Sequence, residues 1–375
     1  MAKNMNKKVI VVSAINIFEG GPLSILKDCI KSFEKSEKFS DYKLVALVHK
    51  KELFNINEFK NITFEEFPKS RKSYILRFYY EYFVFRNIAK KYNPIFWLSL
   101  HDMTPNIGKI PQAVYCHNPS PFNSVNFSDL LIQPKQFFFS LFYKYLYQIN
   151  IKKNKYVIVQ QLWLKNKFVT MYNLSNEQVI IAKPQNIIIP QQYLVKNEKN
   201  EKITFFYPTF PRPFKNIEVI CEAVKILNTK EGLNYNVTIT LDGSENKYAK
   251  KIVTKYKNIA NINFIGLITR EKVYNLYNNV DCLIFSSKLE TWGLPLSEFK
   301  QFDKPIIVAD LSYAKETIGK YEKVCFFNPN KAEELATLME NQILKREIKY
   351  NLTKEINYPK TTVNQWEELF VKLLY

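Results

Sequence analysis

Nearly continuous apolar strands alternate with amphipathic helical stretches along this chain, and that alternation limits the fold more than any other feature. Strands buried on both faces read as unbroken apolar runs, whereas strands with one solvated face alternate between apolar and polar residues. The pattern therefore predicts parallel sheets covered by helices, in two doubly wound, Rossmann-like α/β domains. The expected strands span residues 7–16, 42–50, 62–68, 94–102, 111–119, 156–160 and 178–184 in the first half, and 202–208, 236–243, 262–268, 282–287 and 304–310 in the second.

The domain boundary falls in a polar, proline-containing stretch at residues 184–201, which gives domains of residues 1–185 and 186–358. The five cysteines are scattered and form no CxxC pair, which favours reduced thiols and argues against a zinc site. The first residues lack the apolar core of a secretory signal, and no uninterrupted apolar stretch is long enough to span a bilayer. We therefore expect a cytoplasmic protein.

Positive charge is concentrated in the first half of the chain. The formal net charge is +19, and residues 1–185 carry 27 Lys and Arg against 13 Asp and Glu, while the remainder carries 27 against 22. This asymmetry indicates a surface in the first domain that meets polyanions or anionic lipid. The alternative is that the charge serves only solubility.

In doubly wound sheets, ligands bind beyond the carboxyl ends of the strands, so the residues at those ends are the candidates for function. Gly20 and Gly21 follow the first strand and permit a close backbone approach at a helix N-terminus, which attracts anions. His101 and His117 stand at the ends of adjacent expected strands, and His117, which is followed by "NPSP", is expected on a loop rather than in a core. A histidine that only caps its loop is the alternative for each.

The second domain carries a basic pair at its first strand end. Arg212 and Lys215 lie in the turn before a helix, where a guanidinium and an ammonium can hold phosphate oxygens. Gly243 and Gly266 lie near two further strand ends. The alternative is a solvated basic turn.

Two glutamates, Glu290 and Glu298, surround the turn "TWGLPLS" that leads from a strand into a helix. Backbone N–H groups at Gly293 and Leu294 suit an anion there, and Pro295 suits a helix start. Carboxylates beside an anion site repel the anion if they touch it, so we expect them to accept hydrogen bonds from hydroxyl groups of a sugar and a ribose. A helix-dipole role for Glu298 is the alternative.

These residues together resemble the retaining glycosyltransferases of family 4, which have the GT-B fold of two Rossmann-like domains facing a central cleft. The E-x₇-E motif, Glu290 to Glu298, and the pair Arg212 and Lys215 carry the resemblance, although "FPR" replaces the usual "GR". The further matches are the glycine loop at Gly20 and Gly21, the strand-end histidine His117, Gly243, the segment at Gly266 and Leu267 whose backbone reads the base, and a terminal helix at residues 361–374, within 359–375, that crosses back to the first domain.

The resemblance implies transfer of a hexose-type sugar, with retention, from a UDP- or GDP-linked donor to a glycan acceptor. It gives Glu290 contacts to the donor sugar and Glu298 the ribose, and it places His117 near the reacting centre. Arg212, Lys215 and the backbone N–H groups after Glu290 would stabilise the leaving phosphate, so we expect metal-independent transfer without a cofactor. The lack of a DxD cluster at a strand end agrees with this. A lipid-linked acceptor in surface polysaccharide or lipopolysaccharide biosynthesis would suit the basic first domain.

Two stretches, residues 69–92 and 133–156, interleave Lys and Arg with aromatic residues at near-helical spacing. Such helices can lie peripherally on an anionic membrane, here the inner face of the cytoplasmic membrane. The alternative is that their apolar faces cover the sheet.

Other classes of protein are weighed against the transferase. A nucleotide-sugar epimerase or hydrolase on the same fold would turn over the donor without an acceptor sugar, and a silent partner subunit would lack the polar donor-side residues. A basic nucleic-acid-binding protein would need a recognisable module, and the sequence contains none, so we expect no nucleic-acid partner.

Overall fold

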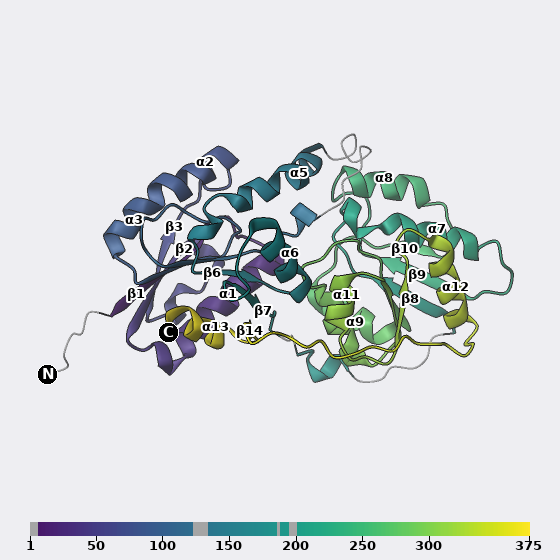
Figure 1. The fold of residues 1–375 in the computed structure, drawn as a ribbon. Coiled ribbons are helices and arrows are strands. Elements are labelled where there is room, and N and C mark those ends of the chain that lie inside the picture. Colours follow the sequence, from purple (N-terminus) through teal and green to yellow (C-terminus); the bar gives the residue numbers. More distant parts are fainter. Residues whose placement is uncertain (1–6, 123–133, 186–187, 195–200) are drawn as a thin grey trace. The chain divides into compact units, whose positions relative to one another are not determined.

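The computed structural model describes residues 7–122, 134–185, 188–194 and 201–375, which form two compact units. Unit 1 comprises residues 1–121, 142–185 and 358–375, and unit 2 comprises residues 122–141 and 186–357. The division at residues 185 and 186 lies at the end of the expected first domain, and the last residues of the chain return to unit 1. Each unit is an α/β structure around its own parallel sheet (Figure 1).

The sheet of unit 1 has eight parallel strands in the order β14-β7-β6-β5-β4-β1-β2-β3. Its central strands are fully buried because helices cover both faces, as their continuous apolar sequences predict. The strands are β1 (Lys8–Ala14), β2 (Tyr42–Val48), β3 (Ile62–Glu66), β4 (Phe96–Ser99), β5 (Gln112–Tyr115), β6 (Tyr156–Val159), β7 (Val179–Ala182) and β14 (Thr362–Val363).

The two faces of this sheet are covered by different helices. On one face, α1 (Gly20–Lys35) and α13 (Trp366–Leu374) pack together, with Phe33 and Phe370 in ring contact. On the other face, α3 (Phe85–Tyr92) packs on Trp97 of β4. Helices α5 (Pro134–Gln148) and α6 (Leu162–Tyr172) follow β5 and β6 in the chain.

Residues 74–92, expected as one helix, are interrupted. Helix α2 (Tyr74–Tyr79) continues through a π-helical turn (Tyr80–Val84) into α3. The side chains of Arg77 and Glu81 in this region are buried and form an ion pair. The interruption therefore coincides with a pair of charges that faces the interior.

The sheet of unit 2 has six parallel strands in the order β10-β9-β8-β11-β12-β13. The strands are β8 (Ile203–Tyr207), β9 (Tyr235–Ile239), β10 (Ile262–Phe264), β11 (Cys282–Phe285), β12 (Ile306–Ala309) and β13 (Val324–Phe327). The helices are α7 (Ile217–Leu227), α8 (Lys247–Tyr256), α9 (Arg270–Asn279), α10 (Leu294–Phe299), α11 (Ser312–Ile318) and α12 (Ala332–Ile343). Among the described residues, no helix is long and apolar enough to cross a membrane.

The structure differs from the sequence-based expectation mainly at segment ends. Residues 362–363, expected within the terminal helix, form strand β14 beside β7, and the helix begins at Trp366. Most strands are shorter at their carboxyl ends than their apolar runs, which leaves His117 and Gly266 in loops. Strand β13 was not expected.

Candidate active site

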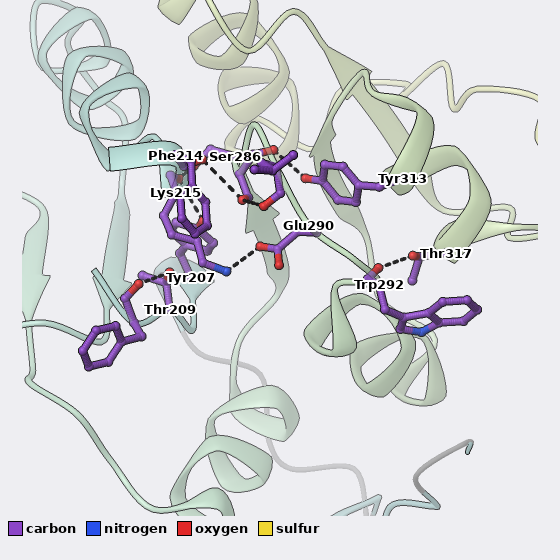
Figure 2. A network of polar contacts seen from close by, with 12 residues as sticks. Tyr207, Thr209, Phe214, Lys215, Ser286, Glu290, Trp292, Tyr313 and Thr317 are labelled. Carbon is purple, nitrogen blue, oxygen red and sulfur yellow. Dashed lines mark hydrogen bonds and ion pairs between the residues drawn. The ribbon is translucent and has the colours of Figure 1, made fainter. Parts of the chain in front are cut away.

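The loops that follow β8 and β11 at the carboxyl edge of unit 2 are tied together by hydrogen bonds (Figure 2). The Tyr207 hydroxyl donates to the Lys215 carbonyl at 2.9 Å, and the Ser286 hydroxyl donates to the same carbonyl at 3.0 Å. The Tyr313 hydroxyl donates to the Ser287 carbonyl at 2.5 Å. These contacts fix the backbone on both sides of the strand ends, so the side chains they carry are held in place.

Lys215 and Glu290 form an ion pair across these two loops, and Figure 2 shows their side chains pointing toward each other. Their side chains keep 18% and 15% exposure, so the pair is partly shielded yet reachable. The sequence predicted both as site residues but not their pairing. The cation and the carboxylate are thus in direct contact. Such a pair can bind a phosphate through the ammonium group and a hydroxyl through the carboxylate.

Arg212 belongs to the same turn as Lys215. The Lys215 N–H donates to the Arg212 carbonyl at 2.8 Å, which closes a 3₁₀ turn of residues 213–215 before α7. The Arg212 guanidinium lies 5.6 Å from the ring centre of Phe210, a half-exposed aromatic residue. The two cations predicted to act together therefore occupy one short turn at the end of β8.

Glu298 lies in a different environment from Glu290. It is buried in α10, where Oε1 accepts a hydrogen bond from Arg270 at 2.7 Å and Oε2 one from the Tyr277 hydroxyl at 3.2 Å. Burial raises the pKa of Glu298, and Arg270 opposes that shift. The sequence did not predict Arg270 or Tyr277, because both reach Glu298 from α9 and only the tertiary structure brings them there.

The glycines of unit 2 occupy turns at its strand ends. Gly293 precedes α10 with a φ of +82°, a left-handed backbone that favours glycine, and Leu294 begins the helix. Gly243 follows β9, and Gly266 and the exposed Leu267 follow β10. All of these predicted residues therefore lie at the carboxyl edge of the sheet.

In unit 1, Gly20 and Gly21 begin α1 after β1. His117 follows β5, half-buried, with its ring stacked on Tyr115 at 4.4 Å between centres. Its backbone N–H donates to the Asp102 carboxylate at 2.6 Å. Burial lowers the pKa of His117, and its Nε2 atom has no hydrogen-bond partner among the described residues.

Asp102, which the sequence analysis did not single out, organises this strand end. Its carboxylate also accepts hydrogen bonds from the hydroxyls of Tyr143 and Tyr147, both at 2.8 Å, and from the Asn118 N–H. Burial and the nearby Asp102 raise the pKa of both tyrosines. The only sequence signal was an acidic residue at the end of an expected buried strand.

His101 lies in the loop after β4, but its side chain is packed in the interior. The side chain is buried, with 3% exposure, and its Nδ1 lies 3.1 Å from the Arg77 guanidinium and 3.2 Å from Glu81. Burial disfavours the charged form of Arg77, but the nearby Glu81 carboxylate keeps the pKa of Arg77 raised. His101 therefore belongs to an internal ion network. Across the described ranges, no group of three or more His, Cys, Asp or Glu side chains is arranged to hold a metal ion.

Comparison with known proteins identifies the segment that carries most of this site. Residues 191–357 match the family described as glycosyl transferases group 1. The O-antigen chain mannosyltransferase RfbU of Salmonella typhimurium is 19% identical over 231 residues. That match spans 61% of this chain and only 60% of the relative's length.

Solved structures share the whole architecture. The lipopolysaccharide outer core galactosyltransferase WaaB superposes with a TM-score of 0.63 at 14% identity, covering 92% of each chain. HepE of Anabaena, in complex with UDP-glucose, gives a TM-score of 0.59 at 13% identity over 90% of each chain. The predicted two-domain fold is thereby confirmed. The chain has the GT-B fold of glycosyltransferases, and residues 191–357 within it match the glycosyl transferases of group 1.

Proposed function

We propose that this protein is a retaining glycosyltransferase that moves a hexose from a nucleotide-sugar donor to a lipid-linked glycan during surface polysaccharide biosynthesis. The observation that carries the proposal is the Lys215–Glu290 pair at the carboxyl edge of unit 2. The group 1 match across residues 191–357 and the polysaccharide-related names of RfbU and WaaB support it.

On this proposal the bound donor separates the ion pair: its diphosphate replaces Glu290 beside Lys215, and its sugar replaces Lys215 beside Glu290. The diphosphate takes the ammonium of Lys215 and the guanidinium of Arg212, and a sugar hydroxyl donates to Glu290. As the bond between sugar and phosphate breaks, negative charge grows on the leaving phosphate, and fixed cations stabilise that charge more than they stabilise the ground state. The two cations take the place that a metal ion has in other transferases.

Retention follows from an attack on the same face as the leaving phosphate. A retaining mechanism otherwise needs a carboxylate nucleophile. The proposal instead gives Glu290 a hydrogen bond from a hydroxyl of the donor sugar, so this carboxylate binds the sugar and forms no covalent intermediate. The proposal assigns acceptor binding to unit 1, with His117 as its candidate catalytic residue.

The test supplies nucleotide sugars with and without a lipid-linked glycan and follows sugar transfer and the anomeric configuration of the product. We expect transfer that depends on the acceptor and keeps the donor configuration. Donor turnover that is independent of acceptor would instead favour an epimerase or hydrolase. A product with inverted configuration would contradict the retaining mechanism but not the transferase activity.

Helix α2 supports peripheral membrane association as part of the same proposal. Along α2 and the π-helical turn that follows it, the side chains are arranged opposite to those of an ordinary amphipathic helix: Arg77 and Glu81 are buried, whereas Ile75, Tyr79 and Phe83 are 84%, 51% and 60% exposed. An apolar face that only covered the sheet would be buried. Exposed aromatic and aliphatic residues beside Lys69, Arg71 and Lys72, with those of α5 (Phe142 and Tyr145), suit the headgroup region of an anionic membrane.

A further inference from the structure

The loops after β9 and β10 place a carboxylate directly against a glycine. A Cβ atom added to Gly266 would lie 2.7 Å from Asp242 Oδ2, so only a glycine admits this approach. Gly266 also has a φ of +69°, which independently favours glycine. Asp242 therefore reaches the loop in which the nucleotide base is expected, a contact that the sequence analysis did not foresee.

The two carboxylate oxygens of Asp242 have different surroundings. Oδ1 accepts the Ser244 N–H at 2.9 Å, which stabilises the turn after β9. The hydrogen bonds from Ser244 lower the pKa of this exposed group, so it is ionised at neutral pH. Oδ2 is the oxygen next to Gly266. Oδ1 therefore holds the turn with one of its two lone pairs, and both oxygens can still accept hydrogen bonds from a ligand.

Apolar side chains stand on both sides of this carboxylate. Strand β9 lies between β10 and β8 in the sheet, so Asp242 lies between the strand ends that carry Leu267 and Phe210. These two side chains are 55% and 45% exposed, and Ile265 is 40% exposed. A flat base can cover such apolar surface with its faces while its polar edge meets the carboxylate.

We propose, on the basis of the proposed function, that the donor nucleotide is a guanine nucleotide and that Asp242 accepts hydrogen bonds from its N1–H and 2-amino groups. Guanine presents two adjacent donors on this edge, which match a carboxylate. Uracil presents one N–H between two carbonyl oxygens, and a carboxylate repels at least one of them. Burying a polar edge against the wrong partner costs more than a correct hydrogen bond gains, so such a site discriminates between bases.

The test measures binding of GDP, inosine diphosphate (IDP) and UDP to the full chain by titration calorimetry. IDP lacks the 2-amino group but keeps N1–H, so it isolates one of the two hydrogen bonds. We expect GDP to bind about tenfold more tightly than UDP, with IDP between them, the range of hydrogen bonds to a charged group.

Asp242→Asn keeps the oxygen that accepts from Ser244 and replaces the other with an amide donor. GDP affinity should fall about tenfold, while UDP affinity should stay unchanged or rise. The matched control is Asp303→Asn, an exposed acid with a left-handed backbone beside the start of β12, at the opposite edge of the sheet. This control should leave both affinities unchanged.

Tighter binding of UDP than of GDP, or an equal loss of both in Asp242→Asn, would overturn the guanine assignment and leave the glycosyltransferase proposal standing. If none of the three nucleoside diphosphates binds, the proposed function itself is overturned.

Discussion

The carboxyl edges of the two sheets use charge in different ways. In unit 2, Lys215 and Glu290 meet each other at a partly open edge, where a ligand can replace either partner. In unit 1, Asp102 is saturated by backbone N–H groups and tyrosine hydroxyls, and the Arg77–Glu81 pair is buried. The edge of unit 2 leaves its charged groups accessible to a ligand, whereas the charged groups of unit 1 are paired inside the protein.

This difference teaches that charged residues at strand ends are not equivalent evidence for function. A buried ion pair costs desolvation that its own hydrogen bonds must offset, so it acts mainly as structure. A partly exposed pair keeps most of its solvation and exchanges partners at low cost. The five predictions below test that contrast, beginning with the largest expected effect.

Lys215→Ala should lower turnover by about 10²-fold or more, as loss of one donor that stabilises the transition state does. Arg212→Ala should do the same. Steady-state kinetics with saturating acceptor measure the effect, and Lys225→Ala, an exposed lysine of α7 paired with Glu222, is the control. Near-normal turnover in both Lys215→Ala and Arg212→Ala would remove the diphosphate from this edge.

The two glutamates should separate kinetically. Glu290→Gln should reduce turnover by about 10²-fold, because it leaves Lys215 without its counter-charge and removes a contact to the donor sugar. Glu298→Gln should mainly weaken binding of the nucleotide diphosphate, because Glu298 lies in the helix behind the loop. If Glu290→Gln weakens binding of a nucleoside diphosphate without its sugar and Glu298→Gln does not, the two roles are reversed.

His117→Ala should reduce transfer at least tenfold with little change in nucleotide affinity, because His117 belongs to unit 1. Since burial lowers its pKa below the ordinary value of about 6.5, the ring is neutral at that pH, and activity should fall only at lower pH. The unfolded chain binds the proton more readily, so stability should also decrease as pH falls below about 6.5. A rate profile that breaks at or above the ordinary value contradicts this assignment.

Asp102→Asn tests whether unit 1 uses this charge internally. Asp102 has a φ of +72°, which asparagine also tolerates, so the change removes charge without adding backbone strain. Hydrogen exchange at the amides of His117 and Asn118 should accelerate, and the free energy of unfolding should fall by about 1–3 kcal/mol. Asp41→Asn, at an exposed position before β2, is the control. Unchanged exchange at both amides would show that Asp102 does not hold this loop.

The smallest effect concerns the outer surface of unit 1. Replacing Lys69, Arg71 and Lys72 with Glu should weaken binding to anionic vesicles by at least about tenfold, and salt should weaken binding of the parent protein. The control reverses three exposed lysines of α8, Lys247, Lys250 and Lys251, which is the same change in net charge. Equal losses in both variants would indicate attraction by net charge alone. A parent protein that ignores anionic vesicles at low salt excludes a membrane role.

The fold could be predicted from the sequence because buried parallel strands leave unbroken apolar runs. Their ends could not, because the chain stays buried after the strand stops. Leu100 and Cys116 are fully or nearly fully buried just beyond β4 and β5, so hydrophobicity alone does not mark where sheet pairing ends. Strand β14, with two residues, is too short for any periodicity.

The candidate site was predictable as a set of positions but not as a set of contacts. Position at a strand end identified Lys215, Glu290 and His117, whose proposed roles stay predictions. The partners Arg270 and Asp102 were not predicted, because each contacts a site residue that is distant in sequence. The burial of His101 could not be predicted for a related reason: the sequence cannot show that the side chains of Arg77 and Glu81 turn inward.

The return of the chain to unit 1 has a consequence for biosynthesis. Strand β14 and helix α13 place Val363, Trp366 and Phe370 in the core of unit 1, yet residues 358–375 are synthesised after the whole of residues 186–357. Most domains fold in the order in which they are synthesised. Here residues 186–357 emerge in full while the first unit still exposes the apolar face that α13 will cover. The N-terminal unit should therefore reach its final state second, and the nascent chain is most prone to aggregate before residues 358–375 emerge.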